Sequence, residues 1–349
     1  MKVLNDTKIK GAVSPFRSLA VLVWVISIIA VSACAPQSTS CAQEDVFCVG
    51  LVTAYDGIDD HGLNQASWET LQNIETQAGI ARLDMIESVD IRDWEKNVAF
   101  FTENNYDVVV TVGRNLSETT IAVAAKYANT LFIGLDQQLE EEYANIASIY
   151  FSEEQAGFLA GRLAALVTEV NQVGAVCESS GIDSVWRYCE GFRLGAKYEN
   201  NDIRIVVAYR DSGSQDDTFN DPAWGEERAI SLIDGGVDVL TGFGGNTAQG
   251  ALLRAAESGI PVIGAEEDLY YRLPELQPVL ITSVINDPSV TLSYLVLMAS
   301  QGEILTGPYA GQVTYTPFRG PNQELAREIE AVLQGIRNNE FEIVLPERK

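Results

Sequence analysis

The sequence predicts an α/β protein of two lobes, each a doubly wound parallel sheet, with a hinge between them. Short apolar runs rich in valine and isoleucine alternate with amphipathic stretches, a pattern typical of parallel strands covered by helices on both faces. The pattern runs to about residue 150 and then restarts. A chain of 349 residues is also long enough for two such units.

The first run of the pattern begins with an uninterrupted apolar segment at residues 47–53, which we interpret as a buried strand. Trp68, Leu71, Ile74 and Ala78 then recur at helical spacing and predict a helix over residues 65–78. The same reasoning predicts further strands at 81–86, 107–112, 131–135 and 146–150, and helices around 94–101 and 121–127.

The second run begins with a long helix at residues 153–170, because small and apolar residues recur along one side of it. Strands are then expected at 172–177, 203–209, 237–241, 261–264 and 279–284, and helices at 185–198, 224–233, 247–256 and 289–299. We expect the last strand and helix to cross back to the first lobe. The predicted lobes are therefore residues 45–150 plus 281–305 and residues 151–280 plus 306–349.

The N-terminal segment has the features of an export signal. Basic residues precede an apolar core from Leu19 to Val31, which is too short for a comfortable membrane span. The core ends in Val31-Ser-Ala-Cys34, which resembles the lipobox of bacterial lipoproteins. We predict a signal peptide at residues 1–33, lipidation of Cys34 and a polar tether at 34–44. The alternative is an ordinary secretory signal with a chance cysteine.

The predicted mature chain is strongly acidic. The full sequence has a net charge of −26, and removal of residues 1–33 leaves 48 acids against 19 bases, or −29. No basic face is available for nucleic acid, and binding to an anionic lipid surface through charge is disfavoured. Anionic ligands are weakly disfavoured as well.

Four cysteines remain beside Cys34: Cys41, Cys48, Cys177 and Cys189. An exported protein can oxidise them, and three pairings are possible, which the sequence leaves open together with free buried thiols. The spacings of the cysteines are long, and His61, the only histidine, lies far from Cys177 and Cys189 in sequence, so we expect no metal site. The single histidine and the missing Gly-x-Ser-x-Gly motif predict that the chain is not an enzyme, and no cofactor is expected.

Candidate site residues follow the predicted strands, because ligands of open parallel sheets bind beyond the carboxyl ends of the strands. After the first strand, Tyr55, Asp60 and Asn64 are expected to face the gap between the lobes. An alternative for Asp60 and its neighbour Asp59 is a purely local role at the positive end of the following helix.

A glycine-rich turn, Gly242-Phe-Gly-Gly-Asn-Thr-Ala-Gln-Gly250, also leads from a strand into a helix. The backbone at Gly245 could approach a ligand closely. The turn is not a P-loop, because the lysine and serine or threonine of that motif are absent. Phe243 is either a core residue or an aromatic wall of the site.

Other polar and aromatic residues lie near strand ends as well. Arg114 could pair with a carboxylate of the protein or of a ligand. Asp136 is either a turn residue or a ligand contact. Trp186 and Tyr188, near the start of a helix, either pack internally or stack on a ring. The acidic cluster Glu266-Glu-Asp268 also follows a strand, and one of its carboxylates could accept two hydrogen bonds from a vicinal diol such as that of ribose.

Several segments together resemble the basic membrane protein family of bacterial lipoproteins. The resemblance spans nearly the whole predicted mature chain, and its segments are 57–71, 151–161, 190–195, 235–239, 263–268 and 282–283. It implies a type I periplasmic-binding fold and a receptor that delivers a solute to an ABC permease. Members of this family include purine-nucleoside receptors.

By position in the family pattern, Asp60, Asn64, Asp136 and Glu266 correspond to polar ligand-binding residues. The resemblance implies that Glu266 binds the ribose diol, where the family usually has aspartate. It also implies that Asn64 and Asp136 bind an edge of the base or sugar.

The chain departs from the family pattern at three positions. Ala54 stands where the family has an aspartate, Leu63 where it has an aromatic residue, and Asn286 where it has a lysine. We hypothesise that another aromatic residue replaces the missing ring; the candidates are Tyr55, Trp186, Tyr188 and Phe243.

The resulting expectation is an exported, lipid-anchored receptor of an ABC importer that closes two lobes over a small polar ligand. A purine nucleoside is the expected ligand. The alternatives are another solute, such as a sugar or a different heterocycle, and a surface sensor that presents its closed form to a signalling partner.

Overall fold

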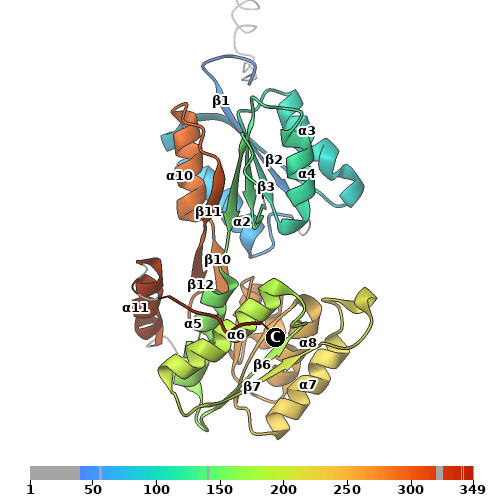
Figure 1. Cartoon of the computed structure of the whole chain (residues 1–349), viewed down its shortest axis with the longest axis vertical. Coiled ribbons are helices and arrows are strands. Elements are labelled where there is room, and N and C mark those ends of the chain that lie inside the picture. The colour runs from blue at the N-terminus through green and yellow to red at the C-terminus, as the bar shows by residue number, and fades with distance from the viewer. Residues whose placement is uncertain are drawn as a thin grey trace, which may run out of the picture. The chain divides into compact units, whose positions relative to one another are not determined.

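The computed structural model contains two six-stranded sheets, each with helices on both faces (Figure 1). It describes residues 40–54, 57–139, 141–319, 325–338, 340 and 342–348. The predicted signal peptide, Cys34 and Tyr55 lie outside these residues. Within the described part, no helix has the length and apolarity needed to cross a membrane. The predicted two-lobe parallel α/β fold is confirmed.

The first lobe is built on a sheet with the strand order β11-β5-β4-β3-β1-β2. All pairings in it are parallel, and the middle strands are almost fully buried because helices cover both faces. Its strands are β1 (Phe47–Thr53), β2 (Ile80–Glu87), β3 (Val108–Val112), β4 (Leu131–Leu135), β5 (Ile146–Tyr150) and β11 (Gly307–Ala310). Its helices are α2 (Leu63–Ala78), α3 (Trp94–Glu103), α4 (Ser117–Ala124) and α10 (Ser289–Ser300).

The second lobe has the strand order β12-β10-β9-β8-β6-β7, in which only β12 runs antiparallel to its neighbour. Its strands are β6 (Gln172–Cys177), β7 (Arg204–Tyr209), β8 (Val239–Phe243), β9 (Val262–Ala265), β10 (Leu280–Asp287) and β12 (Gln312–Tyr315). Its helices are α5 (Glu153–Val167), α6 (Asp183–Glu199), α7 (Pro222–Asp234), α8 (Gly245–Glu257), α9 (Leu269–Arg272) and α11 (Leu325–Arg337).

The chain crosses between the two sheets three times, from β5 to α5, from β10 to α10 and from β11 to β12. These crossings differ from the lobe limits expected from the sequence. Residues 280–287 pair with β9 and β12 and so belong to the second sheet, whereas residues 307–310 pair with β5 in the first. The short strands β11 and β12 have too few apolar residues to be recognised in the sequence. Because β11 joins the first sheet and β12 the second, these strands determine where the chain passes from one lobe to the other.

Helices α5 and α6 cross with their backbones in direct contact. Each contributes two glycines spaced four residues apart, Gly157 and Gly161 from α5 and Gly191 and Gly195 from α6. A Cβ atom added at Gly195 would lie 1.9 Å from the Phe158 carbonyl oxygen, and one added at Gly157 would meet the Tyr188 carbonyl oxygen at the same distance. Only glycine permits this approach. The crossing fixes the first turn of α5 and the inner face of α6.

Two disulfides join residues close in sequence. Cys41 bonds to Cys48 at the start of β1, and Cys177 at the end of β6 bonds to Cys189 of α6. These are the two local pairs among the three possible connectivities. The second disulfide attaches α6 to the strand end beside which the candidate site lies.

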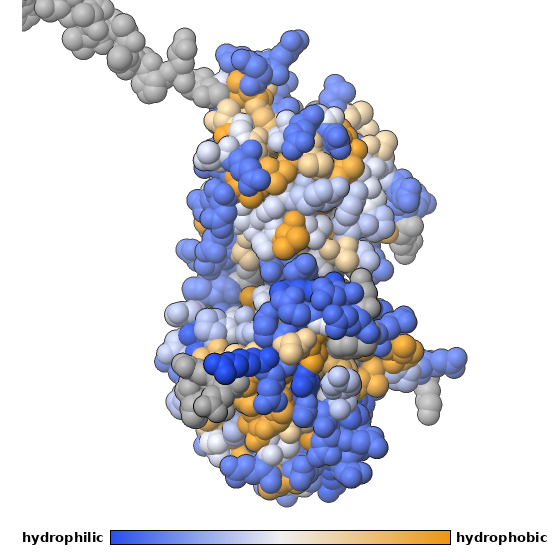
Figure 2. All heavy atoms as spheres, turned by 90° about the vertical axis from the view of Figure 1, so that its left-hand side faces the viewer, coloured by the Kyte–Doolittle hydropathy of each residue, from blue (hydrophilic) through white to orange (hydrophobic). Residues whose placement is uncertain are grey.

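Hydrophilic residues dominate the face drawn in Figure 2, and apolar side chains are scattered over it. This distribution agrees with the strongly acidic composition of the chain. Most large apolar side chains are instead buried in separate clusters against the two sheets.

Candidate functional site

A cavity of about 200 Å³ lies between the two sheets, next to the carboxyl ends of their strands. Both lobes contribute to its walls, as expected for a ligand site in proteins with parallel sheets. Its volume is below the roughly 300–1,000 Å³ of sites for drug-sized molecules, so it suits a small metabolite. The lining residues are Asp60, Leu63, Arg114, Asp136, Glu153, Ala156, Tyr188, Phe243, Glu266, Glu267, Val284 and Asn286.

Two acidic residues of the cavity have left-handed backbone conformations. Asp136 follows β4 with φ 56°, and Glu266 follows β9 with φ 70°. Residues other than glycine rarely adopt this region, and each such position costs about 1–3 kcal/mol. The two strand ends thus hold carboxylates at the cavity in a strained turn, one from each lobe. Strain of this kind is concentrated at functional sites.

Asp60 both caps a helix and lines the cavity. Its carboxylate accepts hydrogen bonds from the backbone N–H groups of Gly62 (2.9 Å), Asn64 (3.0 Å) and Gln65 (3.0 Å) at the start of α2. The local role foreseen as an alternative for this residue is therefore present together with its position at the cavity. Asn64 is buried at the start of α2 and is not among the lining residues.

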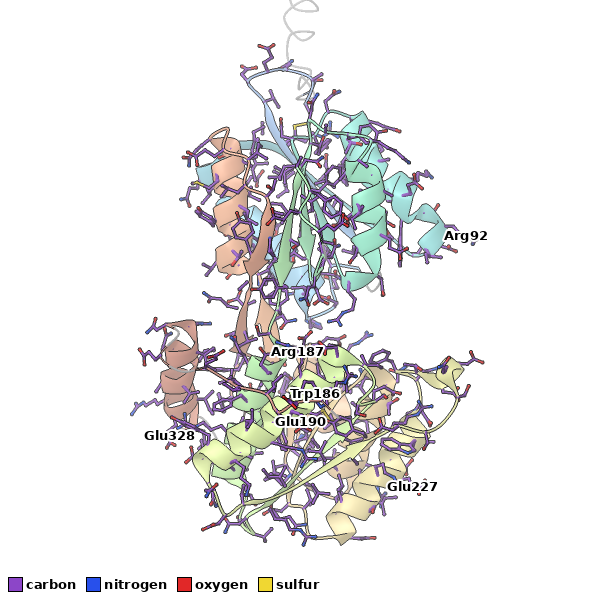
Figure 3. All side chains as sticks on the ribbon, in the orientation of Figure 1. Arg92, Trp186, Arg187, Glu190, Glu227 and Glu328 are labelled. Carbon is purple, nitrogen blue, oxygen red and sulfur yellow. A yellow bond between two sulfur atoms is a disulfide. The ribbon has the colours of Figure 1, made fainter. Side chains whose placement is uncertain are left out.

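A chain of ion pairs lies along one wall. Arg114 pairs with Asp136 through two hydrogen bonds of 3.1 and 3.2 Å, and it also reaches Glu153 at 3.4 Å. Arg187 of α6 approaches Glu153 at 3.6 Å and Glu154 at 2.6 Å. Figure 3 shows Arg187 on the side of the second lobe that faces the first. Since Glu153 begins α5, the Arg114–Glu153 pair connects the two lobes beside the cavity.

Gln137 holds the segment that carries Arg114. This fully buried side chain donates from Nε2 to the Thr111 hydroxyl (3.1 Å) and to the Gly113 carbonyl (3.2 Å). Gly113 has φ 105°, a conformation that favours glycine, and it directs the chain into the turn at Arg114. Gln137 is therefore a positioning residue, and it was not predicted from the sequence.

Two stacked rings form an aromatic wall. The rings of Tyr188 and Phe243 lie 4.4 Å apart and nearly parallel, at 11°. Tyr188 is fully buried, its hydroxyl is hydrogen-bonded to the Thr241 hydroxyl (3.1 Å), and burial raises the pKa of its phenol. Phe243 is therefore backed by a fixed ring, and its remaining exposed surface faces the cavity.

Trp186 and Gly245, two other predicted residues, do not line this cavity either. The ring of Trp186 lies beneath the Arg348 guanidinium, 5.7 Å away. Gly245 begins α8 with φ 57° and packs against the Phe219 backbone, so its role there is conformational. Tyr55 is outside the described residues.

Glu266 has no hydrogen-bond donor for its carboxylate among the described residues. The side chain is exposed, but it faces a cavity that residues of both lobes line. The protein around it replaces part of its hydration and raises the pKa of Glu266 to about 7; nearby Arg114 opposes the shift, and Glu267 and Asp136 add to it. The Asn286 amide also lines the cavity with no protein partner in the described part.

Glu153, Ala156 and Val284 also line the cavity, and none of them was predicted from the sequence. Glu267 lines it as well and belongs to the acidic segment after the strand that was expected there. A signal for Glu153 exists, because it follows β5 directly and the rule of strand carboxyl ends applies to it as well. In the described part of the chain, no group of three or more His, Cys, Asp or Glu residues is arranged to hold a metal ion.

Comparison with known proteins gives consistent matches. A family model described as "ABC transporter substrate-binding protein PnrA-like" matches residues 47–315. The "CD4+ T-cell-stimulating antigen" of Listeria innocua is 26% identical over 267 residues, 72% of each chain. The "ABC transporter nucleoside-binding protein BmpA" of Lactococcus lactis is 25% identical over 63% of this chain and 64% of that protein. "Basic membrane protein A" of Borreliella afzelii is 25% identical over 83% of this chain and 89% of that protein.

Among solved structures, a solute-binding protein of an ABC transporter system from Conexibacter woesei has a TM-score of 0.70 at 19% identity. The match covers 86% of this chain and 99% of that one. A solute-binding protein of the same kind from Aeropyrum pernix has a TM-score of 0.63 at 20% identity. Both matches support the two-lobed fold.

Proposed function

The chain belongs to the Bmp family of PnrA-like ABC transporter substrate-binding proteins, and we propose that it is a lipid-anchored receptor for nucleosides. Its general role is therefore extracytoplasmic solute binding, not catalysis. The proposal adds the class of ligand and the mode of attachment to the membrane.

The observation that carries the ligand proposal is the pairing of a donor-free carboxylate with an aromatic wall in one small cavity. Glu266 has acceptor oxygens available for the two hydroxyl groups of a ribose, and Phe243 offers an apolar face for a base. The Asn286 amide can donate to and accept from polar edges of the ligand. The Lactococcus relative that is named for nucleoside binding supports the same class.

Lobe closure follows from the position of these groups. Asp136 and Arg114 belong to the first lobe, whereas Phe243 and Glu266 belong to the second, so a ligand in the cavity touches both. Such a ligand stabilises the closed arrangement by the difference between its affinities for the closed and open forms. The permease then recognises the closed receptor, and no covalent chemistry is required of this chain.

The charge of the cavity argues against phosphorylated ligands. Five carboxylates line it, and Arg114 is its single basic lining residue among those described. Arg114 is already paired with Asp136 and Glu153. A phosphate group would therefore meet net repulsion with no available cation. The cavity suits an uncharged nucleoside better than the corresponding nucleotide.

We expect purine nucleosides to raise the unfolding temperature of the purified protein, and nucleoside monophosphates and simple sugars to leave it unchanged. At a ligand concentration of about 100 times Kd, binding adds about 2.7 kcal/mol to the free energy of unfolding. A thermal-shift panel of nucleosides, bases, nucleotides and sugars measures this directly. A shift with sugars alone would contradict the proposed ligand class.

The variant Phe243→Ala tests whether the nucleoside that raises the unfolding temperature binds in this cavity. Loss of base stacking costs about 1–3 kcal/mol, so the nucleoside Kd should rise by roughly 5- to 150-fold. Phe100→Ala is the matched control, because Phe100 is 45% exposed on α3 and does not line the cavity. Equal Kd values for Phe243→Ala and the unchanged protein would show that the Phe243 ring does not contribute to nucleoside binding.

Lipid attachment has a separate test. We expect the Cys34→Ala variant to lose incorporation of labelled fatty acid and to move from the detergent phase to the aqueous phase in a detergent-partition assay. A single acyl chain binds membranes only marginally, so the full anchor is expected to carry more than one chain. Unchanged detergent partitioning of Cys34→Ala would contradict lipidation at this cysteine.

A further inference from the structure

We propose that ligand binding in the cavity is coupled to the release of a proton from Glu266, so the receptor holds its ligand more tightly at neutral than at acidic pH. This inference rests on the proposed nucleoside function and adds a pH dependence to the same site. It follows from a difference among the carboxylates of the cavity, of which only Glu266 has no hydrogen-bond or ion-pair partner among the described residues.

Four of the five carboxylates have partners within the protein. Asp60 accepts three backbone hydrogen bonds, and Asp136 forms a two-pronged pair with Arg114. Glu153 lies between Arg114 and Arg187, and Glu267 lies 3.3 Å from Arg272. The remaining carboxylate is Glu266.

Several elements present charged or titratable groups to Glu266. Arg114 comes from the turn after β3, Asp136 from the turn after β4 and Glu153 from the start of α5. Glu267 is its neighbour in the chain, and the Tyr188 phenol of α6 is uncharged because burial raises its pKa. Among the described residues that line the cavity, Arg114 is the one cation, and two other carboxylates share it.

The empty cavity therefore favours the protonated form of Glu266. An additional negative charge there would face Asp136, Glu153 and Glu267, which line the same cavity. The left-handed turn at Glu266 keeps the side chain at this position. The pKa of about 7 agrees with this expectation, and it places the proton exchange near physiological pH.

A bound diol favours the ionised form of the Glu266 carboxylate instead. Two hydroxyl donors can bind both oxygens of an ionised carboxylate, whereas a protonated carboxyl group uses one oxygen to hold its own proton. The ligand therefore lowers the pKa of Glu266, and a proton leaves as the ligand binds. Affinity is then highest above the pKa of the empty site and falls about tenfold for each pH unit below it.

Isothermal titration calorimetry with adenosine and guanosine tests this coupling. At pH 7, in buffers of different ionisation enthalpy, we expect about half a proton to be released for each ligand bound. Between about pH 8 and pH 5.5 the Kd should rise about 30-fold. Neither probe changes its own charge in this range.

Two variants assign the proton to one side chain. Glu266→Gln should bind more weakly, with no proton release and a flat pH profile, whereas Glu266→Asp should keep the release. Glu303→Gln is the matched control, because Glu303 is exposed in the turn after α10, and it should behave as the unchanged protein.

The outcomes separate this inference from the function on which it rests. Nucleoside binding without proton release, or with the same release in Glu266→Gln, would overturn the coupling and leave the nucleoside receptor intact. Failure of every nucleoside to bind at any pH would overturn the proposed function and the coupling together.

Discussion

Arg210→Met should lower the free energy of unfolding by about 3–5 kcal/mol. Arg210 is 5% exposed, and its guanidinium binds Glu178 at 2.8 Å and Asp221 at 2.9 Å. Removal of the guanidinium leaves the Glu178 carboxylate buried without a cation, and one of its oxygens already has no hydrogen-bond partner in the described structure. Urea unfolding followed by circular dichroism measures the loss.

The double variant Glu178→Leu/Arg210→Met should recover most of that stability, because it removes the isolated charge together with its former partner. Arg92→Met is the control for an exposed pair. Arg92 projects from the outside of the first lobe (Figure 3), and its side chain is 84% exposed beside Asp90. Its loss should leave the free energy of unfolding almost unchanged, because water screens an exposed ion pair. Equal effects of Arg92→Met and Arg210→Met would contradict the importance of burial.

The helices and strands of the sheets could be predicted because their local patterns are strong. The runs at Val108–Val112 and Leu131–Leu135 are wholly buried strands flanked by helices, and nearly all of their residues are apolar. The neighbours of a strand within its sheet could not be predicted in this way. Nothing in the residues of β10 indicates that it pairs with β9 and β12, because register and neighbour are decided by long-range contacts.

The positions of the candidate site residues followed from topology more than from residue type. The rule of strand carboxyl ends brought Arg114, Asp136 and Glu266 to one cavity, although they are far apart in sequence. It could not place Trp186, whose ring is covered by Arg348 from the far end of the chain. Such a contact between distant segments leaves no trace in the local pattern around either residue.

Glu153 shows why part of the cavity was missed. An acid in the first turn of a helix is explained by the helix dipole alone, so its local pattern does not require a second role. Its position depends on the close crossing of α5 and α6, which holds the start of α5 beside Arg187. Besides the position of Glu153 after β5, the spacing of the four glycines was a second signal, and its meaning becomes clear only when both helices are seen in contact.

Substitution of Gly195 by valine should have the largest effect on stability of the changes considered, a loss of more than about 4 kcal/mol in the free energy of unfolding. The first added carbon would lie 1.9 Å from the Phe158 carbonyl oxygen and 2.8 Å from the Cα atom of that residue. Backbone atoms cannot rotate out of the way as a side chain does, so the two helices must separate. Urea unfolding measures the loss, and Gly195→Ala should already show a large part of it.

Gly181→Ala is the control for this substitution. Gly181 is exposed, and the nearest atom to an added Cβ is the Ser179 hydroxyl at 3.2 Å, which can move; the expected change is below about 1 kcal/mol. Separation of α5 from α6 would also displace Glu153 and Tyr188 at the cavity. Under conditions where Gly195→Ala remains folded, its ligand affinity should therefore fall, whereas that of Gly181→Ala should not. Unchanged stability and affinity in Gly195→Ala would show that the helices do not cross at this distance, and the wall of the site would need another support.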